Sequence, residues 1–200
     1  MSFKNIYEDW ADSYDLMYRH KDGGIEEFNR LCAKVLPPDL KRKRILEIGC
    51  GTGQAAAALA LAGHQVTAID FSPKKLEIAR GRAARLGLDI DFQEVDFLEK
   101  SKGEPFDVAL ALSSFVTHFL EEERQMRCIR RFRDCLTPDG IAIVGIYDYG
   151  KIMRNEPDLA ISHVAPIPRQ GGDMLYFQRR TWTGEPRNPV HRCCYFMVPD

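Results

Sequence analysis

The sequence predicts a single α/β domain in which helices cover both faces of a mostly parallel β-sheet. Short apolar segments and segments with helical periodicity follow one another from residue 45 to residue 146. The predicted strands are apolar on both faces, which is typical of parallel strands buried between two helical layers. The chain has 200 residues, a length that suits one domain of this class.

The first 40 residues predict two helices. Apolar and aromatic side chains recur there at helical spacing, in two stripes that Asp22, Gly23 and Gly24 separate. The second stripe ends at Pro37 and Pro38, which cannot continue a helix. The first stripe consists of Tyr7, Trp10, Ala11, Tyr14 and Tyr18, and the second of Ile25, Phe28, Cys32 and Val35.

The parallel sheet and its helices are predicted after residue 44. The strands are 45–48, 66–69, 90–95, 106–112 and 141–146, and the helices are 54–62, 73–86 and 121–136. Ser72 followed by Pro73 is a favourable start for the second of these helices, and Gly87 suits its end. The side chains that we expect to face the sheet in the last helix are Met126, Ile129, Phe132 and Leu136.

The last part of the chain predicts two antiparallel strands, at 174–183 and 190–198. Gly184, Glu185 and Pro186 connect them, and this connection is too short for a parallel crossover. We therefore divide the single domain into three segments: a helical segment at 1–40, a ligand-binding core at 41–148 and an antiparallel addition at 149–200.

Composition argues against several classes of protein. The net charge of −1 gives no basic excess for nucleic acid or a membrane surface, and we interpret the basic run 41–44 as a solvated loop. No apolar stretch is as long as a membrane span, and the N-terminal residues lack the apolar core of a signal peptide. The six cysteines form no Cys-x-x-Cys pair, so we expect no metal site and the reduced thiols of a cytoplasmic protein.

Three features fall at the carboxyl ends of predicted strands, where ligands bind in open α/β sheets. Gly49, Gly51 and Gly53 follow the first strand, and bare backbone ahead of a helix can lie close to a ligand. Asp70 ends the second strand, where a carboxylate can accept both hydroxyls of a ribose. Asp96 and Phe97 follow the third strand, where an acid and a ring suit an adenine.

These features resemble the motifs of class I S-adenosylmethionine (SAM)-dependent methyltransferases, which have a Rossmann-like, doubly wound sheet. The matching segments are E-I-G-C-G-T-G at 47–53, D-F-S-P at 70–73 and D-F at 96–97, in this order. The resemblance implies that SAM is bound and released as S-adenosylhomocysteine. It places these residues at the cofactor: Glu47, Gly49, Cys50, Gly51, Gly53, Asp70, Phe71, Asp96, Phe97 and Leu112.

The acceptor site is expected after the fourth strand. Residues 113–120 resemble the S-F-T-H segment of small-molecule N-methyltransferases of the glycine/sarcosine and amino-sugar types, with one extra residue between Phe115 and His118. His118 is a candidate base for an amine, and the alternative is a histidine packed near a helix start. Phe115 is expected to form a wall of the substrate pocket. Tyr147 and Asp148 end the fifth strand and are expected to face the same cleft.

The resemblance implies that the helical segment at 1–40 is a lid and that the antiparallel addition at 149–200 shapes the substrate site. The tyrosines of the first stripe are the candidate lid residues. Tyr14 and Tyr18 resemble the aromatic residues at the start of many small-molecule methyltransferases, where phenol oxygens reach the cofactor or the substrate. Tyr14 is therefore a catalytic as well as a cofactor-binding candidate. The alternative is an amphipathic helix that only covers the sheet.

The sequence thus predicts methyl transfer to a small molecule, with an amine nitrogen as the first choice of acceptor. Oxygen methylation, a SAM-binding module without chemistry and a nicotinamide oxidoreductase are the alternatives. The family core usually ends with a further helix and strand pair, which do not follow residue 200. The chain is therefore a fragment, a minimal variant, or one protomer of a homodimer that covers the sheet edge.

Overall fold

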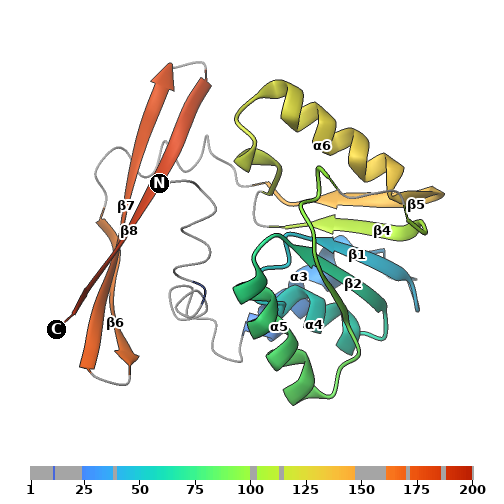
Figure 1. Cartoon of the computed structure of the whole chain (residues 1–200), viewed down its shortest axis with the longest axis horizontal. Coiled ribbons are helices and arrows are strands. Elements are labelled where there is room, and N and C mark those ends of the chain that lie inside the picture. Colours follow the sequence, from blue (N-terminus) through green and yellow to red (C-terminus); the bar gives the residue numbers. More distant parts are fainter. Residues whose placement is uncertain are drawn as a thin grey trace. The chain divides into compact units, whose positions relative to one another are not determined.

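The computed structural model describes residue 11 and residues 24–37, 40–99, 103–112, 115–146, 161–169, 172–185 and 188–199. The chain forms two compact units, Met1–Ile146 and Tyr147–Asp200. The first unit contains a five-stranded parallel sheet with the strand order β3-β2-β1-β4-β5 (Figure 1). Its strands are β1 (Arg44–Ile48), β2 (Gln65–Asp70), β3 (Asp91–Glu94), β4 (Phe106–Ala111) and β5 (Leu136–Val144). The predicted α/β class is therefore confirmed.

Helix α3 (Gly24–Val35) precedes β1, and the other described helices of this unit lie between β1 and β2, β2 and β3, and β4 and β5. These are α4 (Gln54–Leu61), α5 (Pro73–Leu86), the short 3₁₀ helix η1 (Phe115–His118) and α6 (Glu122–Asp134). The predicted boundaries of α5 are confirmed: the Ser72 hydroxyl oxygen accepts a hydrogen bond from the Lys75 amide, and Gly87 closes the helix with a positive φ of 64°. No described helix is long and apolar enough to cross a bilayer.

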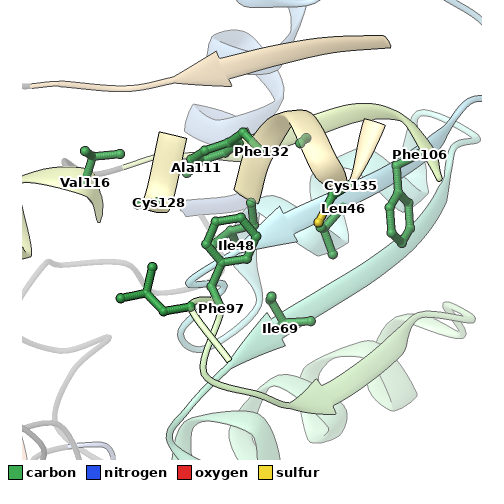
Figure 2. Packing of buried hydrophobic residues seen from close by; sticks show 12 residues of the cluster. Leu46, Ile48, Ile69, Phe97, Phe106, Ala111, Val116, Cys128, Phe132 and Cys135 are labelled. Atoms are coloured by element: carbon green, nitrogen blue, oxygen red, sulfur yellow. The ribbon is translucent and has the colours of Figure 1, made fainter. Parts of the chain in front are cut away.

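Two apolar clusters lie on opposite faces of the sheet. On one face, Cys128 and Phe132 of α6 pack with Leu46 and Ile48 of β1, as Figure 2 shows. On the other face, Ile45 packs with side chains of α3, α4 and α5. These side chains are Cys32, Ala56, Leu59 and Leu76. Successive residues of β1 therefore point to two different helical layers, which explains why the strand is apolar throughout.

The buried face of α6 differs from our prediction. Met126 and Ile129 are 42% and 51% exposed, whereas Cys128 and Phe132 are 0% and 3% exposed. Cys128, Phe132 and Cys135 recur at spacings of four and three residues and share one face, so the cysteines act as small apolar residues. The prediction for Met126 and Ile129 was wrong because it did not count cysteine as a core residue.

The end of α6 and the start of β5 also differ from the prediction. Leu136 belongs to β5, five residues before the predicted start of that strand. Phe106 pairs with Leu136 and Val108 pairs with Ile141, so β5 has more residues than β4 between the same two pairs. The extra residues include Pro138, as expected for a β-bulge, which tolerates a residue without an amide donor.

The second unit is an antiparallel sheet of three strands in the order β6-β7-β8. These strands are β6 (Ile161–Arg169), β7 (Gly172–Glu185) and β8 (Asn188–Pro199). The two strands predicted in this region lie within β7 and β8, and β6 was not predicted. Prolines at 166 and 168 obscured its strand pattern. The division of one domain into lid, core and addition stays a prediction.

Candidate cofactor and acceptor site

A loop of alternating glycines connects β1 to α4. Gly49, Gly51 and Gly53 have φ angles of 69°, 54° and 78°, in the left-handed region that favours glycine. The amides of Gly49 and Cys50 both donate to the carbonyl oxygen of Ile69, at 2.9 and 3.0 Å. Gly53 is the N-cap of α4 and contributes no side chain, so backbone faces whatever binds at this helix start.

Neighbouring side chains leave no space beside two of these glycines. A Cβ atom at Gly49 would lie 2.8 Å from the Phe115 ring, and one at Gly53 would lie 2.7 Å from the Ala79 Cβ. A Cβ atom at Gly51 would meet nothing within 4 Å. Gly49 and Gly53 therefore serve close packing, whereas Gly51 is required by its backbone angle alone. The contact at Gly49 also brings Phe115, a predicted pocket residue, against the loop.

Asp70 ties the loop to the start of α5. Its side chain is buried, and its two carboxylate oxygens accept separate hydrogen bonds. Oδ2 accepts from the Gly51 amide at 2.8 Å, and Oδ1 accepts from the Ser72 amide at 3.0 Å. Each oxygen keeps a second acceptor position. The acid therefore fixes the backbone around it while it can still accept hydrogen bonds from a ligand.

Glu47 lies one residue before the end of β1 and is only 4% exposed. Burial, reinforced by the nearby Asp70 charge, raises its pKa to about 8, and a hydrogen bond from the Ala56 amide acts in the opposite direction. Its Oε2 atom is buried without a hydrogen-bond partner among the described residues. An orphaned acidic oxygen beside a glycine loop fits a cationic group such as the ammonium of SAM.

The loop thiol is not suited to nucleophilic chemistry. Cys50 is buried, and desolvation together with the charges of Glu47 and Asp70 raises its pKa well above the ordinary value. A thiol in such surroundings stays protonated at neutral pH. Among the described residues, no cluster of histidines, cysteines or acids could hold a metal ion.

The residues expected around adenine follow β3. Asp96 is exposed, and its Oδ1 accepts from the Leu98 amide at 3.0 Å. Phe97 is only 3% exposed, and its ring lies 5.1 Å from the ring of Phe132, measured between centroids. In the ligand-free protein Phe97 is therefore a core side chain, and its contact with adenine stays a prediction. Phe71 and Leu112, also expected at the cofactor, are half-buried.

The acceptor segment after β4 forms the 3₁₀ helix η1. Phe115 packs edge-on against Phe119, with ring centroids 5.6 Å apart, and His118 ends the same helix. His118 is exposed at the surface of the chain, yet desolvation and then the charge of Lys75 lower its pKa. The imidazole is therefore neutral at pH 7 and can accept a proton. Tyr14, Tyr18, Tyr147 and Asp148 lie outside the described residues.

Sequence reasoning missed two charged residues near the loop. Lys75 and Arg82 of α5 are 3% and 7% exposed, on the face that also carries Ala79. The Nη1 atom of Arg82 donates to the carbonyl oxygen of Thr52 inside the glycine loop. The signal was present in the sequence, because both cations fall on the apolar stripe of a helix, where charged residues are rare.

Comparisons with known proteins identify the family of this chain. Residues 45–140 match the family described as methyltransferase domain. The chain is 32% identical over 173 residues to the cypemycin N-terminal methyltransferase of a Streptomyces species, covering 84% of this chain and 67% of that protein. It is 39% identical over 116 residues to the ubiquinone biosynthesis O-methyltransferase of Methylocella silvestris, covering 57% of this chain and 43% of the relative. The chain thus spans less than half the length of that relative.

A solved structure shares the fold. SAM-bound CalS10, an amino pentose methyltransferase from Micromonospora echinaspora, matches with a TM-score of 0.62 and 18% identity, covering 93% of this chain and 81% of that chain. The likeness supports the Rossmann-like order of the sheet around the glycine loop and Asp70. Together with the relatives, these features show that the chain belongs to the class I methyltransferases, which use SAM as their cofactor.

Proposed function

We propose that this protein transfers the methyl group of SAM to an amine nitrogen of a small molecule. The observation that carries the proposal is the glycine loop at 49–53, which the buried Asp70 holds through the Gly51 amide. Two similar proteins support nitrogen as the acceptor by their names, one an N-terminal methyltransferase of cypemycin and the other an amino pentose methyltransferase. The resemblance of residues 113–120 to glycine/sarcosine and amino-sugar enzymes points the same way.

The protein's residues bind and orient the cofactor. SAM supplies a methyl group that its sulfonium already activates. Asp70 would accept hydrogen bonds from the ribose hydroxyls, and Asp96 would accept one from the adenine amine. Glu47 would meet the ammonium with its orphaned oxygen. The free amides at the start of α4 favour the carboxylate of the methionine part. Catalysis then depends mainly on alignment and on exclusion of water.

His118 would act on the acceptor. An amine reaches the site largely protonated at neutral pH, so a base is needed before or during transfer. The neutral imidazole would take that proton, and Phe115 beside Gly49 would form the nearby wall of the pocket. The proposal extends to Tyr14, Tyr18, Tyr147 and Asp148 as lid and pocket residues, and to the antiparallel unit as the part that selects the acceptor.

Oxygen methylation is the second candidate. It is favoured by the 39% identity over 116 residues to a ubiquinone biosynthesis O-methyltransferase. A SAM-binding module without chemistry is the third. The proposal also takes the protein to be cytoplasmic, to act without nucleic acid or membrane, and to work as a monomer or a homodimer.

The test is a transfer assay with radiolabelled SAM and pooled small-molecule metabolites, with mass spectrometry of labelled products. Label on an amine supports the proposal, and label on a phenol or an acid oxygen supports the second candidate. Binding of S-adenosylhomocysteine without any labelled product would support a binding module and overturn the proposal. Asp70→Ala is the control, because label must disappear when the cofactor is no longer held.

A further inference from the structure

Helix α5 presents a stripe of three buried residues to the glycine loop. Lys75, Ala79 and Arg82 are spaced four and three residues apart and are at most 7% exposed. Ala79 lies so close to Gly53 that any Cβ atom there would be 2.7 Å from its own Cβ. The stripe is therefore in direct contact with the loop, and Arg82 lies about two turns after Lys75 on that face.

Arg82 reaches the loop itself. Its Nη1 atom donates to the carbonyl oxygen of Thr52, the residue between Gly51 and Gly53. Thr52 is 3% exposed, so water has little access to this carbonyl oxygen. A buried guanidinium is costly unless its N–H groups meet acceptors, and a charge-assisted bond of this kind is about twice as strong as a neutral one.

Further hydrogen bonds hold the backbone of the loop, from β2 and from within the loop. Gly49 and Cys50 donate to Ile69 of β2, Gly51 donates to Asp70, and Gly53 donates to Cys50 within the loop. The Thr52 carbonyl and the Gly53 amide belong to one planar peptide group. This group is held from two sides, because the Gly53 amide donates to Cys50 within the loop and the Thr52 carbonyl oxygen accepts from Arg82 of α5.

We propose that Arg82 is a positioning residue that sets the backbone geometry of the cofactor loop through the Thr52 carbonyl. The proposed role needs no contact between Arg82 and the cofactor, because Arg82 acts through the Thr52 carbonyl oxygen. The inference rests on the proposed function only in naming the ligand as SAM. Its physical content, the link between one guanidinium and one loop, is independent of the acceptor.

The same helix offers a matched control. Arg80 also donates to a backbone carbonyl, since its Nη2 atom lies 3.1 Å from the oxygen of Phe92, but this contact is exposed and belongs to β3. Arg80→Met and Arg82→Met therefore remove the same charge and the same type of bond from one helix. The second change removes a bond to the loop itself, and the first removes a bond to the backbone of β3.

The experiment compares the wild type with Arg82→Met, Arg82→Lys and Arg80→Met. Amide hydrogen exchange of the ligand-free protein is measured at Gly51 and Gly53, and calorimetry gives the affinity for S-adenosylhomocysteine. Arg82→Met should bind the ligand roughly tenfold or more weakly than the wild type. Its amide exchange should be faster than in the wild type at Gly51 and Gly53 but unchanged at β1. Arg82→Lys should recover part of the affinity, and Arg80→Met should match the wild type.

Two results would overturn the proposal. One is Arg82→Met with loop exchange and affinity within about twofold of the wild type, which is less than one hydrogen bond contributes. The other is an equal rise in exchange across β1, β2 and the loop, which would make Arg82 a general stability residue. A wild type that binds no S-adenosylhomocysteine would contradict the proposed function instead, and the exchange data would still decide the role of Arg82.

Discussion

The carboxyl ends of β1 and β2 and those of β4 and β5 lie along one edge of the same sheet, yet they are built differently. Around β1 and β2 several polar side chains are buried, and those of Asp70 and Ser72 accept hydrogen bonds from backbone amides. Around β4 and β5 the surface is open, with Leu120 and Ile146 66% and 62% exposed. The buried polar side chains of the first region are Glu47, Thr52, Gln54, Asp70 and Ser72.

This difference matches the two ligands that the site must serve. A buried network leaves few alternative geometries and suits a cofactor of fixed shape. Phe115 and Val116 of η1 pack on the core, whereas His118 at the end of η1 and Ile146 after β5 are exposed. We therefore expect changes at these two exposed residues to disturb the core little. The comparison predicts that changes near β1 and β2 alter stability and cofactor affinity, whereas changes at η1 alter turnover.

The largest effect on stability is expected at Glu47. Its pKa is about 8 in the folded chain and 4.5 when exposed, so between these values the folded chain holds a proton that the unfolded chain has lost. Stability should therefore fall as the pH rises from 4.5 to 8, and the penalty should be complete above pH 8. The total is on the order of 3–5 kcal/mol.

Glu47→Gln tests this directly. The variant has no group to ionise at this position, so it should gain stability over the wild type as the pH rises from 5 toward 9. Urea unfolding of the ligand-free proteins at several pH values measures the difference. Parallel pH profiles for the two proteins would show that burial of Glu47 has no such cost.

Asp70→Ala should have the next largest effect, on cofactor affinity. The change leaves the Gly51 and Ser72 amides without their acceptor, and each charge-assisted bond contributes about 1.5 kcal/mol or more. Binding of S-adenosylhomocysteine should weaken roughly 100-fold, as calorimetry would measure. Some loss of stability is also expected, which the sequence alone did not suggest. Unchanged affinity would remove Asp70 from the cofactor site.

His118→Asn should affect turnover instead. Loss of a general base lowers kcat on the order of 100-fold, while the affinity for SAM should stay within the error of measurement. In the wild type, the acidic limb of the kcat profile should lie below pH 6.5, because desolvation and Lys75 lower the pKa of His118. Lys75→Met should move that limb to higher pH. Full activity of His118→Asn would make the residue structural.

The smallest effect on stability is expected when alanine replaces either of two glycines with similar backbone conformations, one inside the cofactor loop and one outside it. Gly51 and Gly63 have φ angles of 54° and 87°, and a Cβ atom at either would meet nothing within 4 Å. Alanine at each position should therefore cost a similar 1–2 kcal/mol or so, roughly the strain of one left-handed residue. Thermal unfolding should show equal losses, and only Gly51→Ala should weaken cofactor binding. Equal binding by both variants would disconnect the loop from the cofactor.

The sequence was informative where local chemistry decides the structure. Ser72, Pro73 and Gly87 delimit α5 as predicted, and the glycine loop and Asp70 come together as their positions at strand ends required. The face of α6 could not be predicted in the same way, because Cys128 packs there as an apolar side chain. The helical period alone is compatible with burial of either of two neighbouring faces of α6, and tertiary packing determines which one is buried.

In the candidate site, too, some features follow from the local sequence and others depend on tertiary packing. The acids and glycines of the cofactor loop follow from motif order, but the contact between Arg82 and Thr52 joins residues 30 positions apart and depends on how α5 packs. Phe97, which is expected beside the adenine, packs against Phe132 in the ligand-free protein, and its contact with a ligand stays a prediction. A single sequence cannot rank these alternatives.

A crystal structure with S-adenosylhomocysteine tests the central claim most directly. We expect the ligand to lie against the loop at 49–53, with its ribose hydroxyls on the Asp70 carboxylate and its ammonium on the free oxygen of Glu47. Density for the ligand elsewhere on the protein, or an Asp70 carboxylate that still contacts only Gly51 and Ser72, would contradict this account.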